Sequence, residues 1–283
     1  MRIGIIGASG RMGQWFLRLF ASKGHQVGVY SRRGKTGVET AGVLEFKTVE
    51  ECAKFSEVIL VSVPIAQTAK VVSEVAMSCS STQTIIEIAS LKRKLVPELK
   101  EIAATGVNVL SIHPLFGPGA DISAKQPYAL IPISSDESDE LRRFSKILPD
   151  SRITTVNEES HDKSMGYVLS LTHFVNLAFL SSLTARNELL ELAGTTFKLQ
   201  VSLAQAILHD EPELLAALET ENPYFQNILS DFLKNSRNIE SMVKRKDSRA
   251  LAGLFASTRE KIRESDSFRS SYTSMYEILN RTE

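Results

Sequence analysis

The feature that most constrains the fold is a glycine-rich segment close to the start of the chain. An apolar run at residues 3–6 leads directly into Gly-Ala-Ser-Gly-Arg-Met-Gly at residues 7–13, and an amphipathic segment follows at once. A short strand, a tight glycine turn and a helix in this order are typical of a dinucleotide-binding βαβ unit. The glycines permit a sharp turn and close approach of a pyrophosphate, and the helix amino terminus supplies oriented N–H donors. We therefore expect a dinucleotide to be held by Gly7, Ala8, Ser9, Gly10, Arg11, Met12 and Gly13, where Ala8 replaces the first glycine of the commonest fingerprint.

The first half of the chain alternates apolar runs with amphipathic segments. The pattern predicts strands at 3–6, 26–30, 58–63, 84–88, 107–112, 128–133 and 152–156, and helices at 11–23, 68–77, 96–103 and 137–148. Runs rich in Ile and Val that alternate with helices predict a parallel sheet covered on both faces. From residue 158 the pattern is helical. The sequence thus predicts an α/β fold, with a Rossmann-type doubly wound parallel sheet in a cofactor-binding domain at 1–157 and an all-α domain at 158–283.

Charge and cysteine content exclude several classes of protein. The 33 Lys and Arg residues balance 33 Asp and Glu residues, so the chain lacks the net positive charge of nucleic-acid and anionic-membrane binders. Cys52 and Cys79 stand in no metal-ligand spacing, so we expect two reduced thiols and no metal site. No apolar run approaches the ~18–20 residues that a membrane-spanning helix needs. We expect a cytoplasmic protein with no nucleic-acid or membrane partner.

The end of the second strand indicates which dinucleotide is bound. About 20 residues after the glycine-rich loop, NAD-binding chains normally have an acidic residue for the ribose 2′-hydroxyl. This chain has Ser31, Arg32 and Arg33 there. A hydroxyl and guanidinium groups can bind a 2′-phosphate, which a carboxylate would repel. The sequence favours NADP and leaves NAD possible; the alternative is that the arginines are exposed loop charges.

Residues that follow the later strands are expected beside the reacting end of the cofactor, because ligands of such sheets bind at the carboxyl ends of the strands. Val63 and Pro64 end the third expected strand, Ser90 follows the fourth and His113 the fifth. Histidine takes up a proton near neutral pH, which suits a base that assists hydride removal from an alcohol. His113 could also be a structural residue at a strand end.

Three segments together resemble the prephenate/arogenate dehydrogenase family. They are His-Pro-Leu-Phe-Gly-Pro at 113–118, Ser-Leu-Lys at 90–92 and HDKSMGYVLSLTHF at 161–174. The closest resemblance is to the dehydrogenase part of the enterobacterial bifunctional enzyme, and it extends through 197–199 and 210–214. It implies a Rossmann domain followed by a helical domain that forms a homodimer. The apolar periodicity of Phe225, Ile228, Leu229, Phe232 and Leu233 also favours a homodimer.

The resemblance implies NAD(P)-dependent oxidative decarboxylation of prephenate or arogenate in tyrosine biosynthesis. It implies that His113 is the base that takes the proton of the ring C4 hydroxyl while hydride leaves C4, and that Ser90 orients this hydroxyl. His173 and, more weakly, Thr172 would contact the substrate.

The sequence departs from the family in the segment that binds a substrate carboxylate. Lys198 takes the place of one arginine, and Ala206 stands where the substrate-contacting arginine is expected. Lysine is a point charge without the bidentate geometry of arginine. Lys198 remains a candidate, and Lys163, Arg186 or a partner subunit could supply the missing cation, or the substrate differs.

Other interpretations stay open. The chain could be another two-domain NADP-dependent dehydrogenase of the β-hydroxyacid or F420-linked type, or a non-catalytic NADP-binding sensor. His161 and Asp162 open the helix expected to carry His173. Asp162 and His173 are eleven residues apart, close to three helical turns, so they could line one pocket wall. Alternatively, the pair could be only a helix start.

Overall fold

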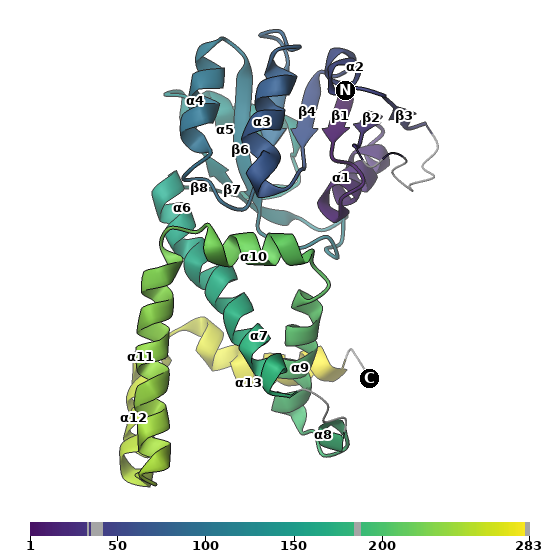
Figure 1. The fold of residues 1–283 in the computed structure, drawn as a ribbon. Coiled ribbons are helices and arrows are strands. Elements are labelled where there is room, and N and C mark those ends of the chain that lie inside the picture. Colours follow the sequence, from purple (N-terminus) through teal and green to yellow (C-terminus); the bar gives the residue numbers. More distant parts are fainter. Residues whose placement is uncertain (33, 35–41, 184–187, 281–283) are drawn as a thin grey trace. The chain divides into compact units, whose positions relative to one another are not determined.

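A single sheet organises the first part of the chain in this computed structural model, which describes residues 1–32, 34, 42–183 and 188–280 (Figure 1). Within these ranges the sheet has eight strands in the order β3-β2-β1-β4-β5-β6-β7-β8. The strands are β1 (Arg2–Ile6), β2 (Gln26–Tyr30), β3 (Leu44–Glu45), β4 (Val58–Val61), β5 (Thr84–Glu87), β6 (Asn108–Pro114), β7 (Gln126–Ile131) and β8 (Ser151–Thr155).

The sheet is parallel except between β6 and β7, which run antiparallel. This one pair therefore departs from the parallel sheet that the sequence predicts. Residues 115–125 contain no helix, and antiparallel strands, unlike parallel ones, need no helical crossover. The pairing carries β6 through Pro114, so His113 lies inside a strand and not just after one. Trp15 anchors the connecting loop by donating its indole N–H to the carbonyl of Ala120, 2.7 Å away.

Helices cover both faces of the sheet, which confirms the doubly wound architecture. Two of them, α1 (Arg11–Ser22) and α5 (Glu137–Ile147), bury residues such as Phe16 and Phe144 in one core. On the other face, α2 (Val49–Phe55), α3 (Ile65–Ala76) and α4 (Val96–Ala104) bury residues such as Val72 and Leu99 in a second core. Burial on both faces explains why the strands read as continuous apolar runs.

Two elements, β3 and α2, were not predicted from the sequence. Strand β3 has only two residues, both exposed, so it has no apolar pattern. Helix α2 had a readable start, because the hydroxyl of Thr48 accepts the N–H of Glu51 while the Glu51 carboxylate accepts the N–H of Lys47. A Thr followed three residues later by Glu is a common signal for a helix start.

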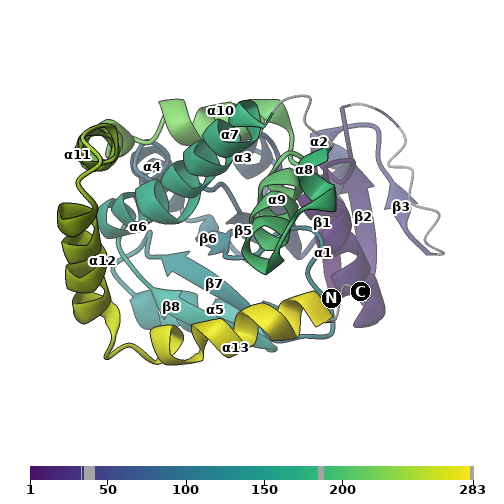
Figure 2. The same ribbon diagram turned by 90° about the horizontal axis from the view of Figure 1, so that it is seen from below.

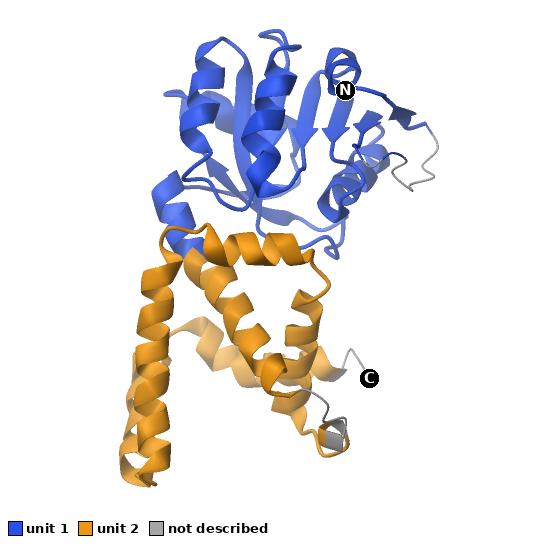
Figure 3. Ribbon diagram, viewed as in Figure 1, with its two compact units in different colours: residues 1–165 blue, residues 166–283 orange. Residues whose placement is uncertain are grey.

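The remaining chain is helical, as expected, and the described residues divide into two compact units at Met165 and Gly166 (Figure 3). Helix α6 (Glu158–Met165) belongs to the first unit, whereas the sequence placed the boundary after residue 157; that domain boundary stays a prediction. The second unit begins with a π-helical segment, Gly166–Leu171, and continues through α7 (Thr172–Ser182), α8 (Glu188–Glu191), α9 (Thr195–Ile207), α10 (Pro212–Thr220), α11 (Phe225–Lys244), α12 (Ser248–Ile262) and α13 (Asp266–Asn280).

Side-chain contacts define the packing inside the second unit. Asn176 of α7 accepts a 2.7 Å hydrogen bond from Gln200 of α9, and the rings of Phe179 and Phe197 meet edge to face between the same helices. Helices α11 and α12 form a hairpin, seen from a second direction in Figure 2. In the described ranges no helix is both long and apolar enough to cross a bilayer. The expected cytoplasmic location stays a prediction.

Candidate functional site

Strand register places the candidate residues of the first unit along one edge of the sheet. Ile6, Val61, Glu87 and Ser111 lie level with one another across β1, β4, β5 and β6. Residues that follow these positions therefore share the carboxyl edge, and they include the glycine-rich loop, Ser90 and His113. The chain leaves β1 toward β2 and leaves β4 toward β5, in opposite directions along the sheet. Ligands of open α/β sheets bind at such a switch point.

The glycine-rich loop has the geometry of a backbone cradle. Gly7 has a φ of +91°, and a Cβ atom there would lie 2.1 Å from the carbonyl oxygen of Ser62. A Cβ atom at Gly13 would lie 2.4 Å from the carbonyl oxygen of Gly7. Helix α1 begins directly after Gly10, and no side chain caps its first turn. Because glycines leave the backbone of the loop uncovered beside a helix amino terminus, the loop fits the pyrophosphate of a dinucleotide.

The other residues expected to bind the cofactor differ in their exposure. Ala8 is fully buried and packs into the core, so only its backbone could face a ligand. Met12 also packs against that core, whereas Arg11 is exposed. Val63 lies against Gly7, with its Cγ1 3.1 Å from the Cβ position of a substituted Gly7. Pro64 precedes the first turn of α3.

The residues expected to select the cofactor lie at the end of β2. The hydroxyl oxygens of Ser9 and Ser31 are 2.6 Å apart, so a hydrogen bond joins the glycine-rich loop to the end of β2. Arg32 is exposed, and Arg33 lies outside the described residues. Ser31 is therefore placed beside the glycine-rich loop, and the roles of Ser31, Arg32 and Arg33 in selecting the cofactor stay predictions.

His113 is buried at the carboxyl edge and is joined to a second histidine. Its Nδ1 lies 3.0 Å from Nε2 of His161, and the two rings meet edge to face. The other nitrogen of His161, Nδ1, lies 2.8 Å from Oδ1 of Asp162. Both His161 and Asp162 come from α6 and are at least 98% buried. Within the described part of the chain, no hydrogen bond reaches Nε2 of His113, so this nitrogen can accept a proton.

A buried ion pair lies beneath the histidines. Nζ of Lys92 donates to Oε1 of Glu87 at 2.5 Å and to the carbonyl oxygen of Ile112 at 2.7 Å, and neither charged side chain is exposed. Ser111 also donates its hydroxyl proton to Glu87. The backbone N–H groups of Lys92 and Arg93 donate to the carboxylate of Asp162, over 2.8 to 3.1 Å. The loop after β5 therefore fixes both β6 and α6.

Burial shifts the pKa values of His113 and Lys92. Loss of solvent lowers the pKa of His113 well below 6.5, and the nearby His161 and Lys92 lower it further. Burial also lowers the pKa of Lys92, while Glu87 opposes that shift. At neutral pH His113 is therefore an uncharged imidazole, the form that can act as a base.

Ser90, the other expected catalytic residue, is half-buried in the turn after β5. In the described residues its hydroxyl forms no hydrogen bond, and none joins it to His113. It therefore shares the carboxyl edge with His113 and leaves its hydroxyl open to a ligand. The role of Ser90 in orienting a substrate stays a prediction.

The expected substrate contacts of the second unit lie on two packed helices. Thr172 and His173 open α7, and Lys198 lies in α9 with an exposed side chain. Nδ1 of His173 is buried and has no hydrogen-bond partner in the part of the chain that the structure describes. Burial lowers the pKa of His173, and Asp210 opposes that shift. Arg186, an alternative cation, lies outside the described residues.

Sequence patterns did not reveal the roles of Glu87, Lys92, His161 and Asp162. They indicated that His161 and Asp162 start a helix, and that Asp162 could share one stripe with His173. However, π-helical turns separate Asp162 from His173, so a three-turn spacing does not apply. The sequence did contain a signal for these residues. Some charged residues directly follow an apolar strand or start a helix within a buried segment. Such residues need partners.

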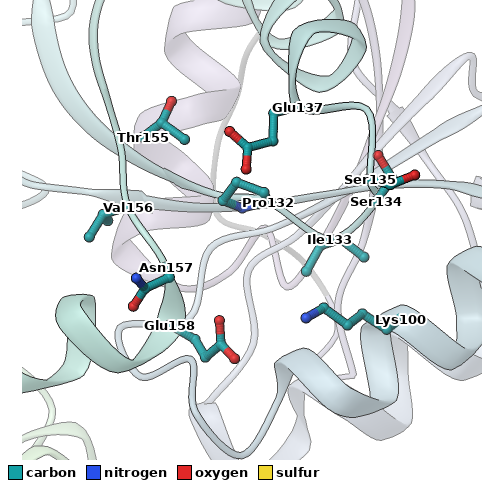
Figure 4. A pocket seen from close by; sticks show the side chains of 10 residues that line it. All are labelled: Lys100, Pro132, Ile133, Ser134, Ser135, Glu137, Thr155, Val156, Asn157 and Glu158. Carbon is teal, nitrogen blue, oxygen red and sulfur yellow. The ribbon is translucent and has the colours of Figure 1, made fainter.

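A separate hollow of about 700 Å³ lies elsewhere in the first unit (Figure 4). It is bordered by the segments after β7 and β8, with the charged side chains of Lys100, Glu137 and Glu158 around it. Neither the glycine-rich loop nor His113 lines this hollow. It is therefore distinct from the site that the sequence and the register define.

Fold and site together define a two-part nucleotide-binding protein with a histidine at the carboxyl edge of its sheet. Two family models match the chain: "Prephenate dehydrogenase, nucleotide-binding domain" over residues 22–153 and "Prephenate dehydrogenase, dimerization domain" over residues 157–257. The chain belongs to the prephenate dehydrogenase family.

Individual relatives agree with this assignment. The chain is 29% identical over 259 residues to a probable arogenate/prephenate dehydrogenase of Methanocaldococcus jannaschii, which covers 87% of this chain and 58% of that protein. It is 26% identical over 251 residues to the T-protein of Haemophilus influenzae, covering 83% of this chain and 63% of that protein. The chain thus spans about three fifths of the length of these relatives.

Solved structures share the fold. Prephenate dehydrogenase from A. aeolicus, in complex with hydroxyphenyl propionate and NAD+, superposes with a TM-score of 0.75 at 19% identity, covering 93% of this chain and 98% of that one. Arogenate dehydrogenase of Synechocystis gives a TM-score of 0.67 at 19% identity, covering 92% of this chain and 98% of the other.

Proposed function

We propose that this chain catalyses NAD(P)-dependent oxidative decarboxylation of prephenate or arogenate. The observation that carries the proposal is His113, which is buried and neutral at the carboxyl edge of a nucleotide-binding sheet, with no hydrogen bond to Nε2 among the described residues. Membership of the prephenate dehydrogenase family supports the reaction. The NAD+ and hydroxyphenyl propionate bound to the A. aeolicus relative support a nicotinamide cofactor and an aromatic product.

Different residues of this chain have separate roles in the proposed reaction. The backbone of residues 7–13 would hold the pyrophosphate, and a bound nicotinamide supplies a hydride acceptor for ring C4. His113 takes the C4 hydroxyl proton on Nε2, so that the C–O bond becomes a carbonyl as hydride leaves. The bond between C1 and its carboxylate then breaks, carbon dioxide leaves, and the electron pair makes the ring an aromatic phenolate. Ser90 orients the C4 hydroxyl.

We also propose that the second unit contributes substrate contacts through His173, Thr172 and Lys198. The buried Nδ1 of His173 without a partner supports this assignment, because buried polar atoms normally have one. Lys198 would attract a carboxylate as a point charge.

The test of the proposed function is an assay of reduced nicotinamide formation. Prephenate and arogenate are each supplied with NAD+ and with NADP+, and the product is identified by mass spectrometry. We expect hydroxyphenylpyruvate from prephenate or tyrosine from arogenate, with one equivalent of carbon dioxide. Absence of reduction with all four combinations, by folded protein that binds the cofactor, would reject the proposal.

We propose that NADP is the preferred cofactor, supported by Ser31 and Arg32 at the end of β2. Arg32→Glu should weaken NADP+ binding by about 10–100-fold, because it removes a charge-assisted hydrogen bond and adds repulsion to the 2′-phosphate. NAD+ binding should be unaffected. Isothermal titration calorimetry measures both, with Arg152→Glu on the far edge strand β8 as the control. Tighter binding of NAD+ than of NADP+ by the unmodified protein would refute the preference.

We propose that the chain forms a homodimer through its helical unit, as the description of the matched dimerization domain suggests. The surface differs from the one expected, because Phe225 and Ile228 are buried within the chain. Instead, Phe255 of α12 and Tyr272 of α13 are 69% and 71% exposed. Exposed aromatic side chains of this size are enriched in interfaces.

The oligomeric state is measured by light scattering coupled to size exclusion. We expect a mass of about twice the 31.3 kDa of the chain at micromolar concentration. Phe255→Glu should shift the mass toward the monomer, because a carboxylate buried without a partner is costly. A monomer for the unmodified protein would contradict this proposal.

A further inference from the structure

A buried chain of hydrogen bonds ends at the base of the proposed reaction. We propose that the His161–Asp162 pair acts as a positioning device that fixes the tautomer of His113, with the proton on Nδ1 and the lone pair on Nε2. This inference deepens the proposed function and rests on it for the role of the lone pair. The tautomer itself can be measured without any reaction.

The direction of each hydrogen bond follows from the partners. An ionised carboxylate only accepts, so Nδ1 of His161 must donate to Oδ1 of Asp162, 2.8 Å away. A neutral His161 then has only a lone pair on Nε2. Nδ1 of His113, 3.0 Å from that nitrogen, must therefore donate its proton. The remaining nitrogen of His113, Nε2, carries the lone pair.

The Asp162 carboxylate, where this series of hydrogen bonds begins, can act only as an acceptor. Oδ2 of Asp162 accepts the N–H groups of Lys92 and Arg93, and Oδ1 accepts the N–H of Lys92 as well as the His161 proton. Donors surround both oxygens, and a carboxylate can accept from all of them. The side chain is 1% exposed, so water does not compete for these bonds.

Lys92 links this carboxylate to the strand that carries His113. Its backbone N–H holds Asp162, while its Nζ donates to the carbonyl of Ile112, next to His113, and to Glu87. Among the described residues, the charged groups that these hydrogen bonds bring around the two imidazoles include Lys92 and Glu87 from the β5 side and Asp162 from α6. Glu159 of α6 is exposed and pairs with Lys163 and Arg93.

Asp162→Asn tests the direction of the hydrogen bonds that link Asp162, His161 and His113. The amide oxygen can satisfy the N–H groups of Lys92 and Arg93 only from the Oδ2 position, which turns the NH2 group toward His161. His161 must then accept on Nδ1 and donate from Nε2, so the proton of His113 moves to its Nε2. This tautomer cannot take a substrate proton. We expect kcat to fall by ~10²–10⁴-fold, as for a base held in the wrong tautomer, with cofactor affinity unchanged.

The direct readout is the ¹⁵N spectrum of histidine-labelled protein without substrate, assigned with His113→Asn. We expect protonated Nδ1 and unprotonated Nε2 for His113 in the unmodified protein, and the reverse in Asp162→Asn. Glu159→Gln, which removes an exposed carboxylate from the same helix, should leave the tautomer and kcat unchanged. His161→Leu should allow both tautomers, which supplies a second variant if Asp162→Asn does not fold.

The outcomes separate this inference from the proposed function. A proton on Nε2 of His113 in the unmodified protein, or a tautomer that Asp162→Asn and His161→Leu both leave unchanged, would overturn the inference. The expected tautomer in a protein that oxidises neither substrate would support the positioning device and reject the proposed reaction.

Discussion

His113→Asn is expected to lower kcat by ~10²–10⁴-fold, the usual contribution of a positioned general base. Asparagine can still bond to a substrate hydroxyl, but it cannot take up its proton. Affinity for NADP+ should change little, because the proposed cradle for the pyrophosphate is residues 7–13 and does not include His113. Steady-state kinetics and calorimetry on the same preparation measure the two effects.

A matched control distinguishes catalysis from damage to the fold. His25→Asn makes the same chemical change at the amino end of β2, the opposite end of the strand from the site. It should leave kcat unchanged. Near-normal turnover by His113→Asn, or a loss that follows only from unfolding, would return His113 to a structural role.

Lys92→Met should destabilise the protein by about 3–5 kcal/mol, because it leaves Glu87 as a buried carboxylate without its cation. The pair is fully buried with a 2.5 Å contact, and methionine keeps most of the side-chain volume. The double variant Lys92→Met with Glu87→Gln should recover part of the loss, since no buried charge remains unpaired. Urea unfolding measures the free energy of unfolding for each variant.

Lys54→Met is the control for this prediction. Lys54 and Glu50 form an ion pair with the same 2.5 Å distance, but both side chains are exposed. Exposed pairs one helical turn apart contribute little to stability, because solvent screens the two charges. If the two lysine variants lose equal stability, the buried pair does not hold the loop after β5 in the way described.

The fold could be predicted from the sequence because local sequence patterns match the elements that form. Continuous apolar strands, the glycine turn at Gly7 and the helical end of the chain each predict the observed elements. The antiparallel strand β7 was not readable, because its apolar run is the same in either direction. Only the absence of a helix between residues 115 and 125 distinguishes the two directions.

Only part of the candidate site could be predicted from the sequence, for a different reason. His113 lies near the carboxyl end of β6 and the glycine-rich loop follows β1, so the periodicity of the strands gives their approximate positions. The partners of His113 come from α6 and from the loop after β5, 48 and 21 residues away in sequence. No local pattern shows that His161 and Lys92 meet His113, because tertiary packing brings them together. Which apolar residues of the helical unit are exposed could not be predicted, for the same reason.

The pH dependence of kcat/KM tests the central claim, a neutral His113 that accepts a proton, most directly. Burial and the nearby His161 and Lys92 hold the pKa of His113 well below 6.5, so the base remains unprotonated through neutral pH. A base is lost as pH falls through its pKa, because the protonated imidazole cannot accept the hydroxyl proton. We therefore expect kcat/KM to stay constant from alkaline pH down to pH 6.5 and to decline only below it. A decline centred at or above pH 6.5 would contradict the account.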